Sequence, residues 1–142
     1  MFKIEFDEPT NGWLPVTIRY QDCEEVLFAS DIPFDPMSQL EDVLDSALTG
    51  VGGEVWWHLE PGGYYLSIKP EKECFHVRLD FSADSKATTR EEVFDFVGTF
   101  DDVVVPLWRS LRKYQSYGYE RFLLSDKVMK SITAHVKANR SK

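Results

Sequence analysis

The sequence has little of the material from which most metal sites and disulfide frameworks are built. Its 142 residues include only three histidines and two cysteines, Cys23 and Cys74, which stand 51 positions apart. That spacing fits neither a metal knuckle nor a disulfide framework, so we expect two reduced thiols. The sequence predicts no bound metal and no cofactor.

Long apolar runs are also missing. No stretch approaches the roughly 20 apolar residues that a membrane-spanning helix requires. The first seven residues alternate between apolar and charged types instead of forming the apolar segment of a secretion signal. We therefore expect a cytoplasmic protein that does not enter a membrane.

The glycines do not form a phosphate-binding loop. Gly50, Gly52 and Gly53 follow a predicted helix and precede a predicted strand, whereas phosphate-binding loops follow a strand and open a helix. No recognised catalytic motif appears elsewhere. The sequence thus predicts no catalytic residue, and we expect the protein not to be an enzyme.

Charge, in contrast, is abundant and unevenly distributed. The net charge is −8, but residues 1–108 carry 22 acidic and 7 basic side chains, whereas residues 109–142 carry 2 acidic and 9 basic ones. An acidic body repels nucleic acid and attracts basic partners over long distances. The basic tail could bind nucleic acid or fold back onto the body, and charge alone leaves both uses open.

Length and composition predict a single domain over 1–142. Hydrophobic residues make up 43% of the chain, which is enough for one core. Period-2 alternation of apolar and polar residues predicts strands over 2–6 and 14–20, and Val26 and Phe28 begin a third short strand. Apolar residues from Met37 to Leu48 then recur at helical spacing, and Gly50 ends that helix.

A hairpin is predicted at Gly62-Gly63, which suits a two-residue turn with positive φ at both positions. This turn pairs Trp56 with Lys69 and His58 with Ser67. A following turn at Glu71-Lys72 then sets Ser67 beside His76 and Tyr65 beside Arg78. Apolar side chains fall on one face of these strands and polar ones on the other.

The last third of the chain predicts a strand and two helices. Residues 82–89 are polar and irregular, and 93–97 form a strand, with helix as the competing interpretation. Thr99 and Asp102 resemble a capping box at the start of a helix whose apolar stripe runs from Phe100 to Leu111. Pro106 either kinks this helix or marks a start near Val105. A final helix opens at Ser125.

Together these elements predict an α+β fold. Its antiparallel sheet has about six to seven strands in a meander that contains the Gly62-Gly63 hairpin. One helix is inserted after the third strand, and two C-terminal helices pack on one face of the sheet.

Two groups on the polar face of the sheet are candidates for function. The row His58, Ser67 and His76 suggests a metal site or an activated serine, but an open sheet face favours a solvated row. Trp56, Tyr65, Lys69 and Arg78 suggest a stacking and cation–π platform, which either binds a partner or is covered by a loop or by the tail.

A third candidate is the acidic region around the third strand and the first helix. Such runs are usually solvated faces, although a protein that neutralises a basic partner has the same pattern. Its acids are Glu24, Glu25, Asp31, Asp35, Glu41, Asp42 and Asp45.

The basic tail interleaves cations with tyrosines, a pattern compatible with nucleic-acid contact. Cations placed toward helix ends and facing the acidic body give the same pattern. Because the body carries charge of the opposite sign, we expect no nucleic-acid partner.

Several runs, Gly12 to Ile18, Gly53 to Pro61 and Phe100 to Arg112, resemble those of a family of uncharacterised small bacterial proteins. In size, acidity and α+β make-up the chain is also similar to immunity proteins, which bind and block secreted toxins. No residue motif defines that group, so the resemblance implies a function but no particular site residues.

The interpretation that we prefer is a non-catalytic protein-binding module of the immunity or inhibitor type, which neutralises a basic partner such as a nuclease toxin. The alternatives are a small-molecule-binding protein or enzyme with a pocket between sheet and helices, and a nucleic-acid-associated factor that uses the basic tail. The candidate interaction surface comprises Trp56, His58, Tyr65, Lys69, His76, Arg78, Glu41, Asp42 and Asp45.

Overall fold

The computed structural model describes residues 1–84, 86 and 88–140 and confirms the α+β fold. Seven antiparallel strands follow one another in chain order across one sheet. The strands are β1 (Phe2–Phe6), β2 (Trp13–Tyr20), β3 (Cys23–Ser30), β4 (Gly53–His58), β5 (Gly63–Glu71), β6 (Cys74–Ser82) and β7 (Glu91–Gly98). The helices are α1 (Pro36–Leu48) after β3, and α2 (Phe100–Ser116) and α3 (Asp126–Arg140) after β7.

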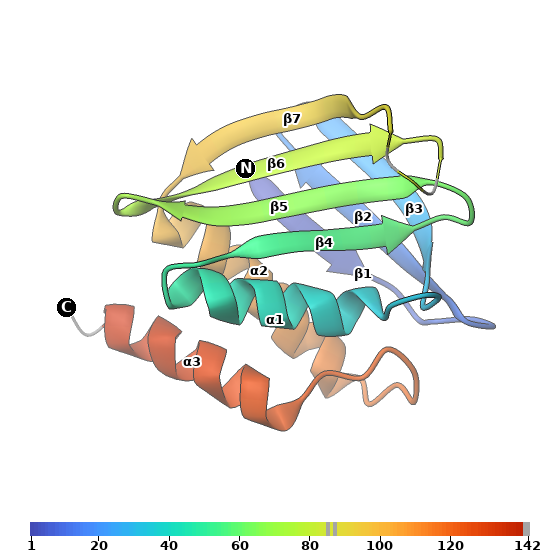
Figure 1. Ribbon diagram of the computed structural model, residues 1–142. Coiled ribbons are helices and arrows are strands. Elements are labelled where there is room, and N and C mark those ends of the chain that lie inside the picture. The colour runs from blue at the N-terminus through green and yellow to red at the C-terminus, as the bar shows by residue number, and fades with distance from the viewer. Residues whose placement is uncertain (85, 87, 141–142) are drawn as a thin grey trace.

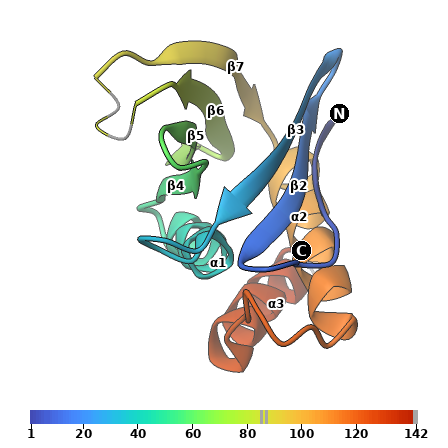
Figure 2. The same ribbon diagram turned by 90° about the vertical axis from the view of Figure 1, so that its right-hand side faces the viewer.

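The sheet bends sharply between β3 and β4. In the described part of the chain these two strands pair only at Ser30 and His58, and Figure 2 shows β1–β3 and β4–β7 as two arms that diverge from this join. Aromatic side chains connect the arms elsewhere, because the ring of Tyr20 on β2 stacks on Phe96 of β7 with centroids 3.9 Å apart. The sheet therefore curls around its own core.

The three helices lie together along one side of the curled sheet (Figure 1). α1 packs against β4 and β5, α2 packs against β1, and α3 packs against both other helices. The core between these layers includes Trp57 of β4, Leu44 of α1 and Leu107 of α2, all fully buried. No helix in the described residues is both long and apolar enough to span a membrane.

The register predicted for the first hairpin is wrong by four residues. The turn consists of four residues, 59–62, with the Leu59 amide donating to the Gly62 carbonyl at 3.1 Å, so that Trp56 pairs with Tyr65 instead of Lys69. A two-residue turn at Gly62-Gly63 would put Pro61 beside the turn, where the flanking residue must donate its N–H across the hairpin. Proline has no N–H, which excludes that register.

A second proline explains the shift in the next hairpin. The turn lies at Lys72-Glu73 instead of Glu71-Lys72, because Glu71 pairs with Cys74. The predicted turn would have placed Pro70 beside it. Both changes of partner are by an even number of residues, so every side chain keeps its predicted face of the sheet.

The C-terminal elements confirm the capping box and the last strand. Residues 91–98 form β7 and not a helix, although residues 85 and 87 of the irregular segment before it lie outside the described residues. Thr99 caps α2, whose Asp102 amide donates to the Thr99 side chain at 3.2 Å. Pro106 lies inside α2, so the start near Val105 is wrong.

Candidate functional site

The predicted platform forms, but a different residue supplies its cation. The rings of Trp56 and Tyr65, paired across β4 and β5, stack with centroids 5.9 Å apart and an interplanar angle of 7°. The Arg90 guanidinium carbon lies 4.1 Å from the centroid of the Tyr65 ring. Arg90 lies immediately before β7, and its guanidinium covers one side of the Tyr65 ring. Lys69 pairs instead with His76, at the far end of β5.

Both arginines on this face are held by carboxylates. Arg90 binds both carboxylate oxygens of Glu54, at 2.8 and 3.0 Å. Arg78 donates to the buried Asp80 at 2.8 Å and lies 3.5 Å from Asp95. Asp95 also contacts the imidazole of His76 at 2.6 Å. The face therefore carries an ion-pair network across β4–β7 in which Arg78 and Arg90 are neutralised by carboxylates of the same face.

The predicted row of His58, Ser67 and His76 does not form. His58 pairs with Gly63, whereas Ser67 lies between Glu54 and Arg78. His58 is buried, with its Nδ1 close to the Ile32 carbonyl and its ring 4.2 Å from that of Trp56. The described residues contain no group of three or more His, Cys, Asp or Glu side chains that could hold a metal ion. His58 thus anchors the segment after β3 to β4.

The acids of α1 face the basic tail. Glu41, only 2% exposed, accepts hydrogen bonds from the Ser125 amide at 2.8 and 3.1 Å, just before α3 begins. Asp45 accepts one from the Ser131 hydroxyl of α3 at 2.7 Å. Two of the three predicted acids of α1 therefore hold the tail helix against the body, and Asp42 is exposed.

Burial of the Glu41 carboxyl has an electrostatic consequence. Removal of this group from water raises its pKa to about 7, an effect that the Ser125 hydrogen bond opposes and that the nearby Asp42 and Asp35 carboxylates reinforce. Near neutral pH, the contact between α1 and α3 therefore contains a titrating group.

The strand β3 presents an apolar surface that the sequence pattern did not reveal. Val26 is 63% and Phe28 58% exposed, whereas Leu27 and Ala29 face the core. The exposed apolar side chains continue beyond the strand with Ile32, 62% exposed, and Phe34, 57% exposed. The sequence does contain a sign of this surface. Residues 26–29 are all apolar, whereas apolar and polar residues alternate in a strand that exposes one face to water.

The backbone of β3 is also open along one edge. Pairing with β2 around the turn after Tyr20 uses the N–H and C=O groups of alternate residues of β3, beginning with Cys23. The backbone N–H and C=O groups of Glu24, Val26 and Phe28 consequently point away from β2. On that side, β4 pairs with β3 only at Ser30. A broad hollow of about 760 Å³ adjoins this edge, and Trp13, Leu59 and Tyr64 contribute to its lining.

Carboxylates border this apolar strand. Glu24 and Glu25 lie on β3, and Asp31 and Asp35 lie on the segment that follows. Glu25 accepts a hydrogen bond from the Tyr64 hydroxyl at 3.3 Å. Burial, with help from Glu25, raises the pKa of Tyr64 to about 12. We define the β3 surface as Val26, Phe28, Ile32 and Phe34 with the acids Glu24, Glu25, Asp31 and Asp35.

Comparison of the chain with protein-family models, curated proteins and solved structures finds no match.

Proposed function

We propose that this protein is a non-catalytic protein-binding module, of the immunity or inhibitor type, that docks a basic partner on the β3 surface. The observation that carries the proposal is the coincidence of an exposed apolar row, an open strand edge and an acidic border on one strand. Contiguous apolar surface bordered by polar groups is typical of interaction sites. The cytoplasm is the compartment that we propose, with Cys23 and Cys74 as free thiols.

The open edge favours a partner that adds a strand. An extended segment alongside β3 would pair with the free N–H and C=O groups of Glu24, Val26 and Phe28. It would also remove Val26 and Phe28 from water, which stabilises a complex by about 25 cal/mol for each Å² of apolar surface buried. Open edges invite self-association, and the acids Glu24 and Glu25 on the same strand disfavour it through like-charge repulsion.

Charge favours a basic partner. The body, residues 1–108, carries 22 acidic against 7 basic side chains, and long-range attraction of this kind raises association rates. Lysines or arginines of the partner that flank its apolar residues would meet Asp31, whereas Glu24 already pairs with Arg19 at 2.6 Å. A basic secreted toxin, such as a nuclease, has this chemistry.

A small-molecule function has one observation in its favour. A hollow of about 240 Å³ lies between β1 and α2, lined by Phe2, Phe6 and Tyr114 among others. Ligand pockets usually enclose about 300–1,000 Å³, so this space favours at most a small ligand. A thermal-shift screen against a metabolite library tests this alternative, which gains support from a single stabilising compound.

Affinity capture from the native host at low salt tests the protein-binding proposal. The bait is the wild-type protein, the variant Phe28→Ser, or the matched control Leu123→Ser, whose residue is equally exposed but distant in sequence. We expect a basic protein, identified by mass spectrometry, to be retained by wild type and Leu123→Ser and lost by Phe28→Ser. Equal retention by all three baits, or no partner at low salt, contradicts the proposal.

A further inference from the structure

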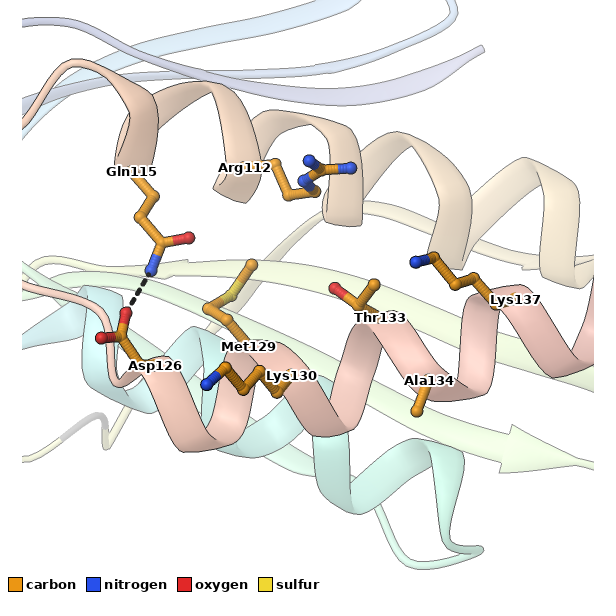
Figure 3. Close-up of a pocket in the computed structure, with 8 residues that line it drawn as sticks. All are labelled: Arg112, Gln115, Asp126, Met129, Lys130, Thr133, Ala134 and Lys137. Atoms are coloured by element: carbon orange, nitrogen blue, oxygen red, sulfur yellow. Dashed lines mark hydrogen bonds between the residues drawn. The ribbon is translucent and has the colours of Figure 1, made fainter.

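A basic groove separates α2 from α3 on the helical side of the molecule. Its volume is about 420 Å³, and its lining includes Arg112 of α2 and Lys130, Thr133 and Lys137 of α3. Figure 3 shows the side chains of Arg112, Thr133 and Lys137 directed into the space between the two helices. The groove does not include any residue of the β3 surface, and the inference below does not depend on the proposed function.

Trp108 of α2 organises the cations around the groove. Its indole Nε1 donates a hydrogen bond to the Thr133 hydroxyl at 2.9 Å and so ties α2 to α3. The guanidinium carbons of Arg112 and Arg140 lie 5.1 and 5.6 Å from the centroid of its ring. Contacts of this kind orient a guanidinium while leaving its N–H donors free for an anion.

Three cations at the groove, Arg112, Lys130 and Arg140, lack among the described residues the carboxylates that neutralise the arginines of the sheet. In the part of the chain that the structure describes, no carboxylate lies within 4.0 Å of the charged groups of Arg112, Lys130 or Arg140. The acid that lines the groove, Asp126, accepts a hydrogen bond from the Gln115 amide at 3.1 Å. Asp126 is the one acid among the described residues that line the groove, so it offsets only part of the positive charge there.

The spacing of the cations indicates the size of the ligand. Lys130 and Arg140 stand ten residues apart on α3, which separates their backbones by about 15 Å along the helix axis. Arg112 projects from the opposite wall. One small anion is too short to contact both walls and both ends of such a groove. A ligand with two or more charged groups in a row fits it better.

We propose that the groove between α2 and α3 binds a ligand that carries at least two phosphate groups. The guanidinium fork of Arg112 matches two phosphate oxygens, and ammonium groups bind phosphates as point charges. A strand of nucleic acid and a free polyphosphate share this chemistry. Binding of either is strongest at low salt, because each phosphate contact releases counterions.

Titration of the ¹⁵N-labelled full-length protein tests the proposal, with NMR chemical shifts as the measurement. The probes are sodium tripolyphosphate, a thymidine oligonucleotide of 12 nucleotides, and poly-glutamate at matched ionic strength. We expect amide shifts for residues of α2 and α3 that line the groove with at least one phosphate probe. Shifts with both probes assign a general phosphate site, and shifts with only one identify its source.

Two variants distinguish the groove from general surface charge. Lys130→Gln and Arg112→Gln each remove one cation of the groove, and Arg121→Gln removes an exposed cation outside it. We expect each groove variant to weaken binding about tenfold at low salt and to reduce the slope of log K against log salt by about 0.7 for the oligonucleotide. Arg121→Gln should bind as wild type does.

Three results overturn the proposal. They are the absence of shifts with both phosphate probes, an equal loss of affinity in Arg121→Gln, and binding of poly-glutamate as tight as that of the phosphates. Lys130→Gln keeps the test valid if Arg112→Gln disturbs the packing of Trp108, because Lys130 is exposed.

Discussion

The arginines of the sheet and those of the helices have opposite environments. Arg19, Arg78 and Arg90 on the strands and their adjoining segments each contact one or more carboxylates. Arg112 and Arg140 on the helices lie against the Trp108 ring. The difference follows from the composition of the two regions, because residues 1–108 have an excess of acids and residues 109–142 have almost none. The arginines of the sheet are thus held by carboxylates, whereas Arg112 and Arg140 are held against an aromatic ring.

The same comparison explains how the tail is held. The α1 carboxylates that contact α3 accept hydrogen bonds from the Ser125 amide and the Ser131 hydroxyl, not from lysine or arginine. The basic side chains of α3 consequently remain on its other faces. The tail thus folds back onto the acidic body, one of the two arrangements that charge alone left open, and the α1 carboxylates hold it through an amide and a hydroxyl.

The largest effect is expected from the carboxylate at the centre of the sheet network. Asp80 is buried and contacts Arg78 at 2.8 Å and Arg90 at 3.8 Å. Asp80→Ala should lower the free energy of unfolding by about 3 kcal/mol, because two guanidinium groups lose a buried partner. Urea denaturation measures this change. The control Asp126→Ala, in the helical region, should cost much less, and equal losses would break the comparison.

The next effect concerns Glu41 and pH. Its pKa is raised in the folded protein to about 7 from 4.5, so the folded state binds the proton more tightly and stability falls as pH rises from about 4.5 to 7. Glu41→Gln should remove this slope and raise the free energy of unfolding by about 3 kcal/mol relative to wild type at pH 8, with little difference at pH 4.

Denaturation curves of both proteins from pH 4 to 8 check this prediction. The exposed Glu73, in the turn between β5 and β6, provides the control, since it is not among the groups that act on Glu41 and Glu73→Gln should leave the slope unchanged. A wild-type slope that persists in Glu41→Gln would show that another group carries the pH dependence.

A smaller effect is expected for single arginines. Arg78→Gln should lower the melting temperature more than Arg112→Gln, because only Arg78 leaves a buried carboxylate without its closest cation. Differential scanning calorimetry of the two variants at the same salt concentration makes the comparison. If Arg112→Gln lowered the melting temperature more than Arg78→Gln, the arginine of the helix would contribute more to stability than the arginine of the sheet, which contradicts the comparison.

The smallest effect is expected on the β3 surface. Because Phe28 is exposed, Phe28→Ser should change the free energy of unfolding by less than about 0.5 kcal/mol. Urea denaturation again provides the measurement. A loss of several kcal/mol would show that Phe28 packs in the core and is not available to a partner.

The strands and helices could be predicted because alternation and helical spacing are local signals. The register could not, since it depended on where two hairpins turn, and the missing N–H groups of Pro61 and Pro70 decided this. The prediction of which side chains share a face was nevertheless correct, because each register error shifted the partners by an even number of residues. Trp56 and Tyr65 could therefore be assigned to one face before their pairing was known.

The parts of the site that depend on tertiary contact escaped prediction. Arg90 reaches Tyr65 from an irregular segment, and no periodic pattern encodes that approach. Val26 and Phe28 marked a strand but not its orientation, because apolar residues occupy both of its faces. The groove between α2 and α3 required the packing of two helices around Trp108, although the basic composition of the tail had indicated its charge.

The central claim is that Arg112 is available to bind an anion, whereas Arg78 is held by carboxylates. It is tested most directly by measuring how much a ligand stabilises the protein. Thermal unfolding of wild type, Arg78→Gln and Arg112→Gln is measured with and without sodium tripolyphosphate at constant ionic strength. Binding to the folded state alone raises the melting temperature, so we predict an increase for wild type and Arg78→Gln and a markedly smaller one for Arg112→Gln. An equal increase in all three proteins, or a loss of the increase in Arg78→Gln alone, would contradict the account.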